Sequence, residues 1–204
     1  MPSAREALLD SAYAALTTLP WTAVRMVDVA AAAGVSRQTL YNEFGSKGGL
    51  ARALVRRAAD GYLAGVERTL GTHPAEGGGP AELARWTVRA AHGDVLVKAL
   101  ITGVWGDHLP RPDASPAGRY GAPAPPTATE MLALVRDRAV AVLGAGPSPR
   151  DPVRLELCCE VALRLALSYT LVPADSGPGP GITAPNRTAA DRSHRRSPVR
   201  STPA

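Results

Sequence analysis

The sequence predicts an all-α protein, and three observations support this prediction. Apolar residues recur at spacings of three and four over most of the chain, as they do on one face of a helix. Ala, Leu and Arg, which favour helices, dominate the composition, whereas only 4% of the residues are aromatic. Stretches rich in Gly and Pro separate the periodic segments. The 45% of apolar residues can form a buried core.

The first helix is expected over residues 3–19, with Ser3 as a possible N-cap. A second, Ala-rich helix follows from about Met26 to Ala33. Gly34 then supplies the positive φ that a sharp turn between helices needs. Ser36 stands where the N-cap of a third helix is expected, because its side-chain oxygen can accept from an amide of the next turn.

The third predicted helix, Ser36–Phe44, has few apolar side chains. Leu40 and Phe44 are four residues apart and therefore share a face. The remaining positions carry Arg37, Gln38, Thr39, Tyr41 and Asn42. Arg, Gln and Asn can pair with base edges in a major groove, so this pattern indicates a helix-turn-helix that reads DNA. An ordinary helical hairpin with a polar face is the alternative reading of the turn alone.

The segment V-A-A-A-A-G-V-S-R-Q-T-L-Y-N-E-F-G-S-K, residues 29–47, resembles the DNA-binding signature of the TetR family of bacterial transcriptional regulators. The resemblance extends over about residues 5–60. It implies a homodimer with an N-terminal three-helix helix-turn-helix DNA-binding domain and a helical ligand-binding and dimerisation domain. The residues expected to contact DNA are Arg25, Ser36, Arg37, Gln38, Thr39, Tyr41, Asn42 and Lys47.

Two features depart from the family pattern. Arg25 stands where the family commonly has a threonine that caps the second helix, and arginine caps poorly. Gly48 and Gly49 stand where the family usually has an acidic residue and a good helix former. Glycine costs about 1 kcal/mol against alanine inside a helix, so the start of the fourth helix is expected to be loose.

A long helix is expected to continue to about Leu70, and the stretch Gly71–Pro80 marks a boundary. Two helices follow from Ala81 to about Val104, with a break near His92-Gly93-Asp94. The stretch Pro110–Pro126 holds six prolines and two glycines, so it is expected to be a loop, either a lid or disordered. The predicted domains are residues 1–71 (DNA-binding, with the connecting helix), 80–173 (ligand-binding and dimerisation) and 174–204 (disordered tail).

Two further helices are predicted, over residues 127–143 and 152–172. The last has one polar stripe, formed by Glu156, Glu160, Arg164 and Ser168, and is apolar around the rest of its circumference. Such a helix must be buried on most sides. In a domain this small, a second subunit can provide the extra burial, so the helix predicts a symmetric homodimer.

Trp86, Trp105 and Met131 are candidates for a ligand pocket, with core packing as the alternative for each. The absence of charged clusters near them in the sequence favours an apolar or aromatic small molecule as effector. The four histidines are scattered, and the sequence has no HExxH or CxxC pattern. We therefore expect no catalytic residue, no metal site, no cofactor and no enzymatic activity.

The net charge of +5 does not by itself indicate a DNA-binding face. Residues 1–71 contribute a net +2 and residues 174–204 a net +3, whereas the residues between them are balanced. The local charge that can neutralise DNA phosphates comes instead from three residues beside the turn, Arg25, Arg37 and Lys47. Cys158 and Cys159 are adjacent and read as buried apolar residues. With no apolar run of about 18 residues and no signal peptide, the chain is expected to be cytoplasmic and to have no membrane partner.

Together these features predict a ligand-responsive regulator, expected to be a repressor that binds a palindromic DNA operator as a homodimer and is released by a small effector molecule. The alternative function is a helical dimeric interaction module, or a nonspecific nucleoid-type DNA-binding module without ligand control.

Overall fold

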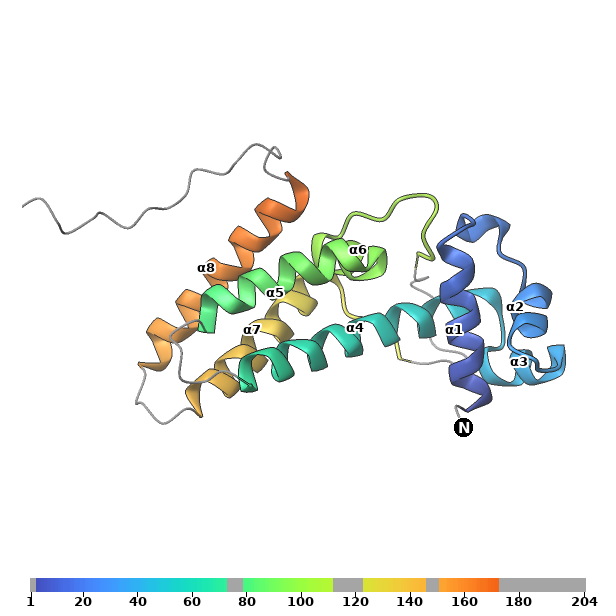
Figure 1. Ribbon diagram of the computed structural model, residues 1–204, viewed down its shortest axis with the longest axis horizontal. Helices are drawn as coiled ribbons and strands as arrows, with labels where there is room; N and C mark the ends of the chain where they lie inside the picture. The colour runs from blue at the N-terminus through green and yellow to red at the C-terminus, as the bar shows by residue number, and fades with distance from the viewer. Residues whose placement is uncertain (1–2, 73–78, 112–122, 146–150, 173–204) are drawn as a thin grey trace, which may run out of the picture. The chain divides into compact units, whose positions relative to one another are not determined.

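The computed structural model describes residues 3–72, 79–111, 123–145 and 151–172. All regular structure in these segments is helical (Figure 1), which confirms the predicted all-α class. Residues 1–173 form one compact unit, and the predicted tail, residues 174–204, lies outside the described residues. The elements are, in chain order, α1 (Ala4–Leu16), the 3-10 turn η1 (Trp21–Ala23), α2 (Met26–Ala32), α3 (Arg37–Phe44), α4 (Lys47–Gly71), α5 (Gly79–Gly93), α6 (Val95–Thr102), α7 (Ala128–Gly144) and α8 (Pro152–Leu171).

Helix α1 begins with a complete capping box. The Ser3 hydroxyl accepts from the amide of Glu6 at 3.2 Å, and the Glu6 carboxylate accepts from the amide of Ser3 at 2.9 Å. The helix ends at Leu16, slightly earlier than predicted. Its Leu8 and Leu9 are buried, and the helix packs against α2, α3 and α4. This packing holds α2 and α3, which form the helix-turn-helix, against α1.

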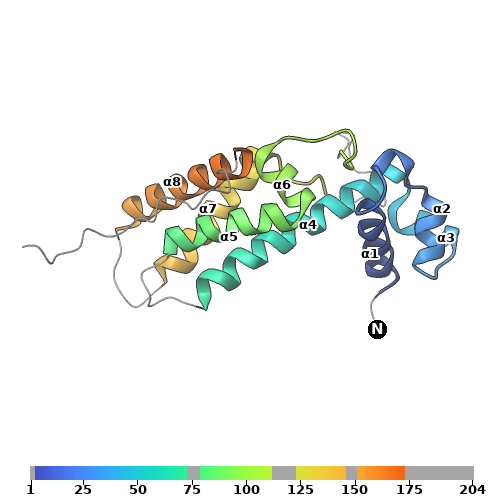
Figure 2. The ribbon, with the colours of Figure 1, turned by 45° about the horizontal axis from the view of Figure 1, so that its top comes forward.

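Helix α4 is the longest element, with 25 residues. Its first turns pack against α1 and α3, and its later turns pack against α5 and α7 (Figures 1 and 2). Apolar side chains are buried along most of its length, from Leu50 to Leu70. The predicted connecting helix is therefore present and joins the N-terminal helices to the C-terminal bundle.

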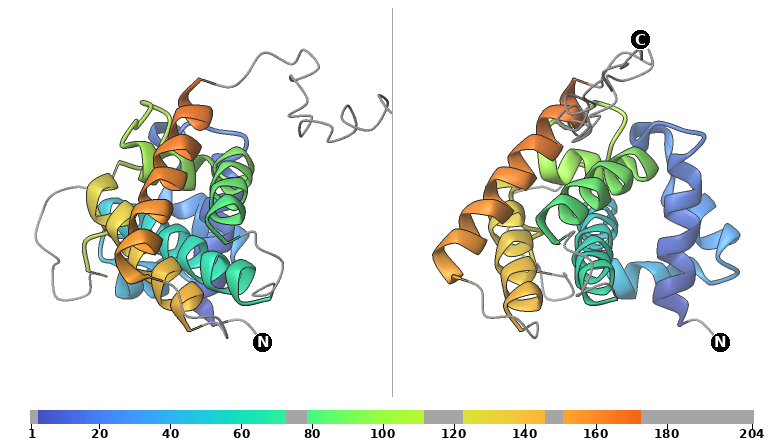
Figure 3. Two further views of the ribbon diagram at one scale, coloured as in Figure 1. Left: turned by 90° about the vertical axis from the view of Figure 1, so that its left-hand side faces the viewer. Right: turned by 60° about the vertical axis from the view of Figure 1, so that its left-hand side comes forward.

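Helices α5 to α8 complete this bundle around α4. Helix α5 packs along α8 and α4, and α7 packs on α4 and α8. Figure 3 shows α8 lying across α5 and α7 with its other side facing outward. The largest side chains buried in this part of the core are Leu83, Leu96, Leu100, Ile101, Met131 and Leu163.

The predicted break between α5 and α6 is confirmed. Asp94 caps α6, because its Oδ1 accepts from the amides of Leu96 at 2.8 Å and Val97 at 3.4 Å. Gly103, with φ of 71°, ends the helix. The segment that follows lies against the N-terminal helices, since the amide of Trp21 donates to the carbonyl of His108 at 2.8 Å.

Two predicted features fall mostly on residues that the structure does not describe. Residues 73–78 contain most of the predicted domain boundary, and residues 112–122 contain most of the Pro110–Pro126 loop. The division into domains and the choice between a lid and disorder therefore remain predictions.

No helix within the described segments is long and apolar enough to cross a membrane. In the same segments, no group of three or more His, Cys, Asp or Glu side chains is placed to hold a metal ion. Cys159 is buried as predicted, whereas Cys158 is exposed, which corrects the prediction for that residue.

Candidate nucleic-acid interface

The turn before α3 has the geometry that the sequence predicts. Gly34 has φ of 67°, a left-handed conformation that favours glycine. The amide of Val35 donates to the carbonyl of Ala30 at 3.0 Å and closes the turn. Ser36 then caps α3, because its hydroxyl accepts from the amide of Thr39 at 3.0 Å. These local bonds hold α3 at a fixed angle to α2.

Helix α3 buries only one face. Leu40 and Phe44 are buried in the core, as predicted. Arg37, Gln38 and Asn42 are exposed. A short, capped helix with an exposed polar face is the usual element that enters a major groove.

Tyr41 and Thr39 differ in how far they extend from α3. Tyr41 is exposed, so its ring is available to a partner. Thr39 is partly buried, and its Oγ1 lies 2.9 Å from the Oγ of Ser36. The Thr39 side chain therefore has less conformational freedom than the exposed side chains of Gln38 and Tyr41.

Two of the polar side chains on α3 bond to each other. The Nε2 of Gln38 donates to the Oδ1 of Asn42 at 2.9 Å, one helical turn away. This bond leaves the Oε1 of Gln38 as an acceptor and the amide hydrogens of Asn42 as donors. An acceptor beside a donor is the pattern that pairs with the N6 and N7 atoms of adenine.

Arg25 occupies the N-cap position of α2, and among the described residues its side chain makes no capping bond. Its guanidinium instead donates to both carboxylate oxygens of Asp28, at 2.7 and 2.9 Å. Hydrogen bonding to Arg25 lowers the pKa of Asp28. Both side chains are exposed, so the pair can open, but Asp28 offsets part of the charge that Arg25 would bring to a phosphate.

Lys47 is the first residue of α4, three residues after the end of α3. Its Nζ donates to the carbonyl of Thr22 at 3.2 Å and lies 5.3 Å from the centre of the Trp21 ring. Partial burial lowers the pKa of Lys47. The DNA contact predicted for Lys47 would thus come from an ammonium group that also contacts η1.

The start of α4 is well capped, and Gly49 has a packing role that the sequence did not indicate. The hydroxyl of Ser46 accepts from the amide of Gly49 at 3.1 Å. A Cβ at Gly49 would lie 1.9 Å from the carbonyl oxygen of Phe44. Glycine is therefore needed here because the backbone of α4 passes directly against the end of α3.

Arg5 supports the same C-terminal end of α3, a role that the sequence pattern does not indicate. Its NH1 donates to the carbonyl of Glu43 at 3.3 Å and to the carboxylate of Glu43 at 3.4 Å. The guanidinium also lies 4.7 Å from the centre of the Phe44 ring. A cation at the C-terminus of a helix is favourable. No local signal reveals it, because Arg5 belongs to α1.

The three candidate ligand-binding residues lie in different surroundings. Trp86 is partly buried on α5 and lines an open cleft of about 440 Å³. Met131 is fully buried in the core, and Trp105 is partly buried in the segment after α6. Within the described residues, neither of these two lines that cleft. A ligand role for all three remains a prediction.

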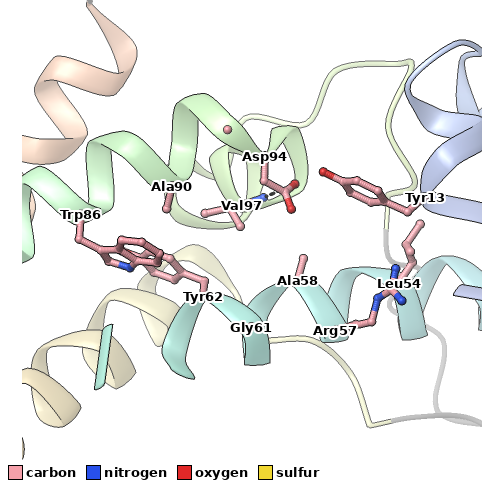
Figure 4. A pocket seen from close by; sticks show the side chains of 11 residues that line it. Tyr13, Leu54, Arg57, Ala58, Gly61, Tyr62, Trp86, Ala90, Asp94 and Val97 are labelled. Atoms are coloured by element: carbon pink, nitrogen blue, oxygen red, sulfur yellow. Dashed lines mark hydrogen bonds between the residues drawn. The ribbon is translucent and has the colours of Figure 1, made fainter. Parts of the chain in front are cut away.

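The cleft is bounded by α1, α4, α5 and α6 (Figure 4). Trp86 and Tyr62 lie at one end, and Tyr62 is bonded to Thr87 through their oxygens, 2.8 Å apart. Burial raises the pKa of Tyr62 to about 12. At the other end the Tyr13 hydroxyl points toward the Asp94 carboxylate. Burial, and then the charge of Asp94 and a hydrogen bond to it, raise the pKa of Tyr13.

Comparison with known proteins bears on the N-terminal helices first. The model of the family described as bacterial regulatory proteins, tetR family, matches residues 8–54. The HTH-type transcriptional regulator AlkX of Mycobacterium tuberculosis is 47% identical over 66 residues, which are 32% of this chain and 31% of AlkX. The match to this relative thus spans about a third of its length.

A solved structure extends the similarity to the whole fold. The TetR family repressor AlkX from Dietzia sp. strain DQ12-45-1b, implicated in biodegradation of n-alkanes, has a TM-score of 0.50 at 21% identity. The alignment covers 84% of this chain and 86% of that one. At this identity the likeness concerns the fold alone. Residues 8–54 therefore form a helix-turn-helix domain of the TetR family of bacterial transcriptional regulators.

Proposed function

We propose that the protein is a cytoplasmic repressor that binds a palindromic DNA operator as a homodimer and is released by a small, mainly apolar effector. The observation that carries this proposal is the exposed polar face of α3, held by the Ser36 cap and the Gly34 turn. A helix so presented can read base edges, while Lys47 and Arg25 beside it can reach phosphates.

The homodimer is supported by the outer side of α8. Val153, Leu157, Val161, Leu165 and Tyr169 repeat at four-residue spacing and are 48–76% exposed. Large exposed apolar patches in monomers are uncommon and mark interaction sites. A second copy of α8 packed on this stripe by two-fold symmetry would bury it, and it would place two α3 helices for two half-sites.

The effector response is supported by the cleft between α1, α4, α5 and α6, because its walls join the DNA-binding helices to the bundle. A ligand there can change operator affinity only if it binds the DNA-free arrangement more tightly. The alternative is a helical dimer that binds DNA or protein without sequence readout or ligand control.

Selection of bound sequences from a random DNA pool tests the proposal against this alternative. A repressor of this kind should recover a palindrome, and the recovered site should outcompete random DNA by about a thousandfold or more. Equal competition by random DNA would rule out operator recognition and leave the nonspecific module.

Gln38→Ala should relax the preference at one base pair in each half-site, at a cost of about 1–3 kcal/mol. Because Gln38 and Asn42 are bonded, Asn42→Ala should relax the same base pair. Both effects can be measured by repeating the selection with each variant and by titrating the recovered sites. A uniform weakening on every sequence would show that Gln38 reads no base.

Lys47→Ala should weaken binding to all sequences alike and reduce the slope of log affinity against log salt by about 1. Lys98→Ala is the matched control, since Lys98 is an exposed lysine on α6. The measurement is a fluorescence-anisotropy titration over a range of salt concentrations. An unchanged slope for Lys47→Ala would mean that this ammonium only holds η1.

A further inference from the structure

We propose that the cleft between α1, α4, α5 and α6 binds an organic amine, with its ammonium group at Asp94 and Tyr13 and an apolar body extending to Trp86. This inference rests on the proposed effector response and specifies the chemical class of the effector. The proposed amine differs from a purely apolar effector by one positive charge.

The size and shape of the cleft suit such a molecule. Its volume of about 440 Å³ falls within the usual range for small-molecule sites. Trp86 lies on α5, and Asp94, which directly follows the last residue of α5, is about two helical turns further along the chain. Figure 4 shows the Tyr62 and Trp86 rings at one end and Tyr13 with Asp94 at the other. An occupant that spans both ends therefore needs an apolar part and a polar part.

The apolar part has suitable neighbours. Ala58 on α4 and Ala90 on α5 line the cleft between its two ends, and Leu54 on α4 lies at the end near Tyr13 (Figure 4). The aromatic side chains beyond them offer flat surfaces for a ring or a chain. The Tyr62 hydroxyl is already bonded to Thr87, whereas the buried Nε1 of Trp86 has no hydrogen-bond partner among the described residues and can donate to a polar atom of the ligand.

The charged residues that line the cleft are one carboxylate, Asp94, and one guanidinium, Arg57. Asp94 uses Oδ1 to cap α6, and in the part of the chain that the structure describes neither cap bond uses its Oδ2. Arg57 also lines the cleft, but its NH1 donates to Asp10 at 2.5 Å and its NH2 to the carbonyl of Leu9 at 3.0 Å. With this cation already paired, an ammonium is favoured over a carboxylate.

The position of the site connects ligand binding to DNA binding. Tyr13 belongs to α1, which packs against α2 and α3, whereas Asp94 begins α6. An ammonium bound between these two side chains would change the contact between α1 and α6. By thermodynamic linkage, a ligand that lowers operator affinity must itself bind less tightly to the operator complex.

The test uses three matched probes that share an apolar body: phenylbutylamine, phenylbutanol and phenylbutyrate. Calorimetric titration of the full chain without DNA should show that the amine binds about tenfold or more tightly than the other two. Equal affinities, tighter binding of the carboxylate, or no binding of any probe would overturn the proposal. Because no DNA is present, these outcomes do not depend on operator recognition.

Two variants locate the binding site. Asp94→Asn keeps a good N-cap for α6 and removes the charge, so it should abolish the preference for the amine, whereas Asp107→Asn, an exposed control, should keep it. Gly61→Leu should block all three probes, because a Cβ at Gly61 meets no described heavy atom within 4 Å and extends the wall of the cleft. Melting temperatures establish that the variants fold. Undiminished amine binding in either cleft variant would place the site elsewhere and overturn the proposal.

Discussion

Val161→Glu is expected to convert the protein to a monomer and to lower its operator affinity by about a hundredfold or more. Val161 is the middle residue of the exposed apolar stripe on α8, so in a two-fold interface it lies near its own copy. Two glutamates there would repel each other and lose water without a partner. A monomer binds one half-site at a time and forfeits the gain from linked binding, which commonly amounts to factors of 100 or more.

Sedimentation measures the first effect and titration with the selected operator the second. Val95→Glu is the matched control, because Val95 is 49% exposed on α6 and Val161 is 48% exposed on α8. Glutamate in the first turn of a helix is also favourable. A wild-type protein that sediments as a monomer at micromolar concentration would contradict the dimer, as would a Val161→Glu variant that stays dimeric.

Gly49→Ala is expected to destabilise the protein and to weaken operator binding. The new Cβ would lie 1.9 Å from the Phe44 carbonyl oxygen, which belongs to the backbone and cannot rotate away. The end of α3 must then move relative to α4, and overpacking of this kind typically costs about 1–3 kcal/mol. This cost exceeds the gain of about 1 kcal/mol that alanine brings to a helix. Because α3 carries the side chains that we propose to read bases, operator affinity should fall as well.

Gly61→Ala provides the comparison within the same helix. No heavy atom among the described residues lies within 4 Å of a Cβ at Gly61, so this variant should gain about 1 kcal/mol in unfolding free energy. Chemical denaturation of both variants gives the difference. If Gly49→Ala is as stable as Gly61→Ala, the close approach of α4 to Phe44 is not a constraint in solution.

The sequence was sufficient to predict those parts of the site that depend on neighbouring residues. The Gly34 turn, the Ser36 cap and the buried pair Leu40 and Phe44 are all confirmed. Each depends on spacings of three or four residues and on one backbone angle, which a local pattern can reveal. The same reasoning predicted the break that Asp94 makes between α5 and α6.

Contacts between distant segments could not be predicted in this way. Arg5 reaches Glu43 and Phe44 only because α1 crosses the end of α3. Gly49 was interpreted as a weakness of α4, yet its backbone lies against a carbonyl of α3. The cleft with Tyr13 requires four helices to meet, and no spacing along one of them indicates it. These features depend on how helices that are distant in the sequence pack against one another.

The bond between the Trp21 amide and the His108 carbonyl has a consequence for the order of events during synthesis. The ribosome completes the helix-turn-helix long before His108 emerges, and chain segments fold as they appear. The N-terminal helices can therefore assemble first through contacts close in sequence. The hydrogen bond from the Trp21 amide of η1 forms only after His108 has been synthesised. In a nascent chain stalled before His108, η1 should consequently be less ordered than in the complete protein. Lys47, which donates to the Thr22 carbonyl of η1, should be less ordered as well.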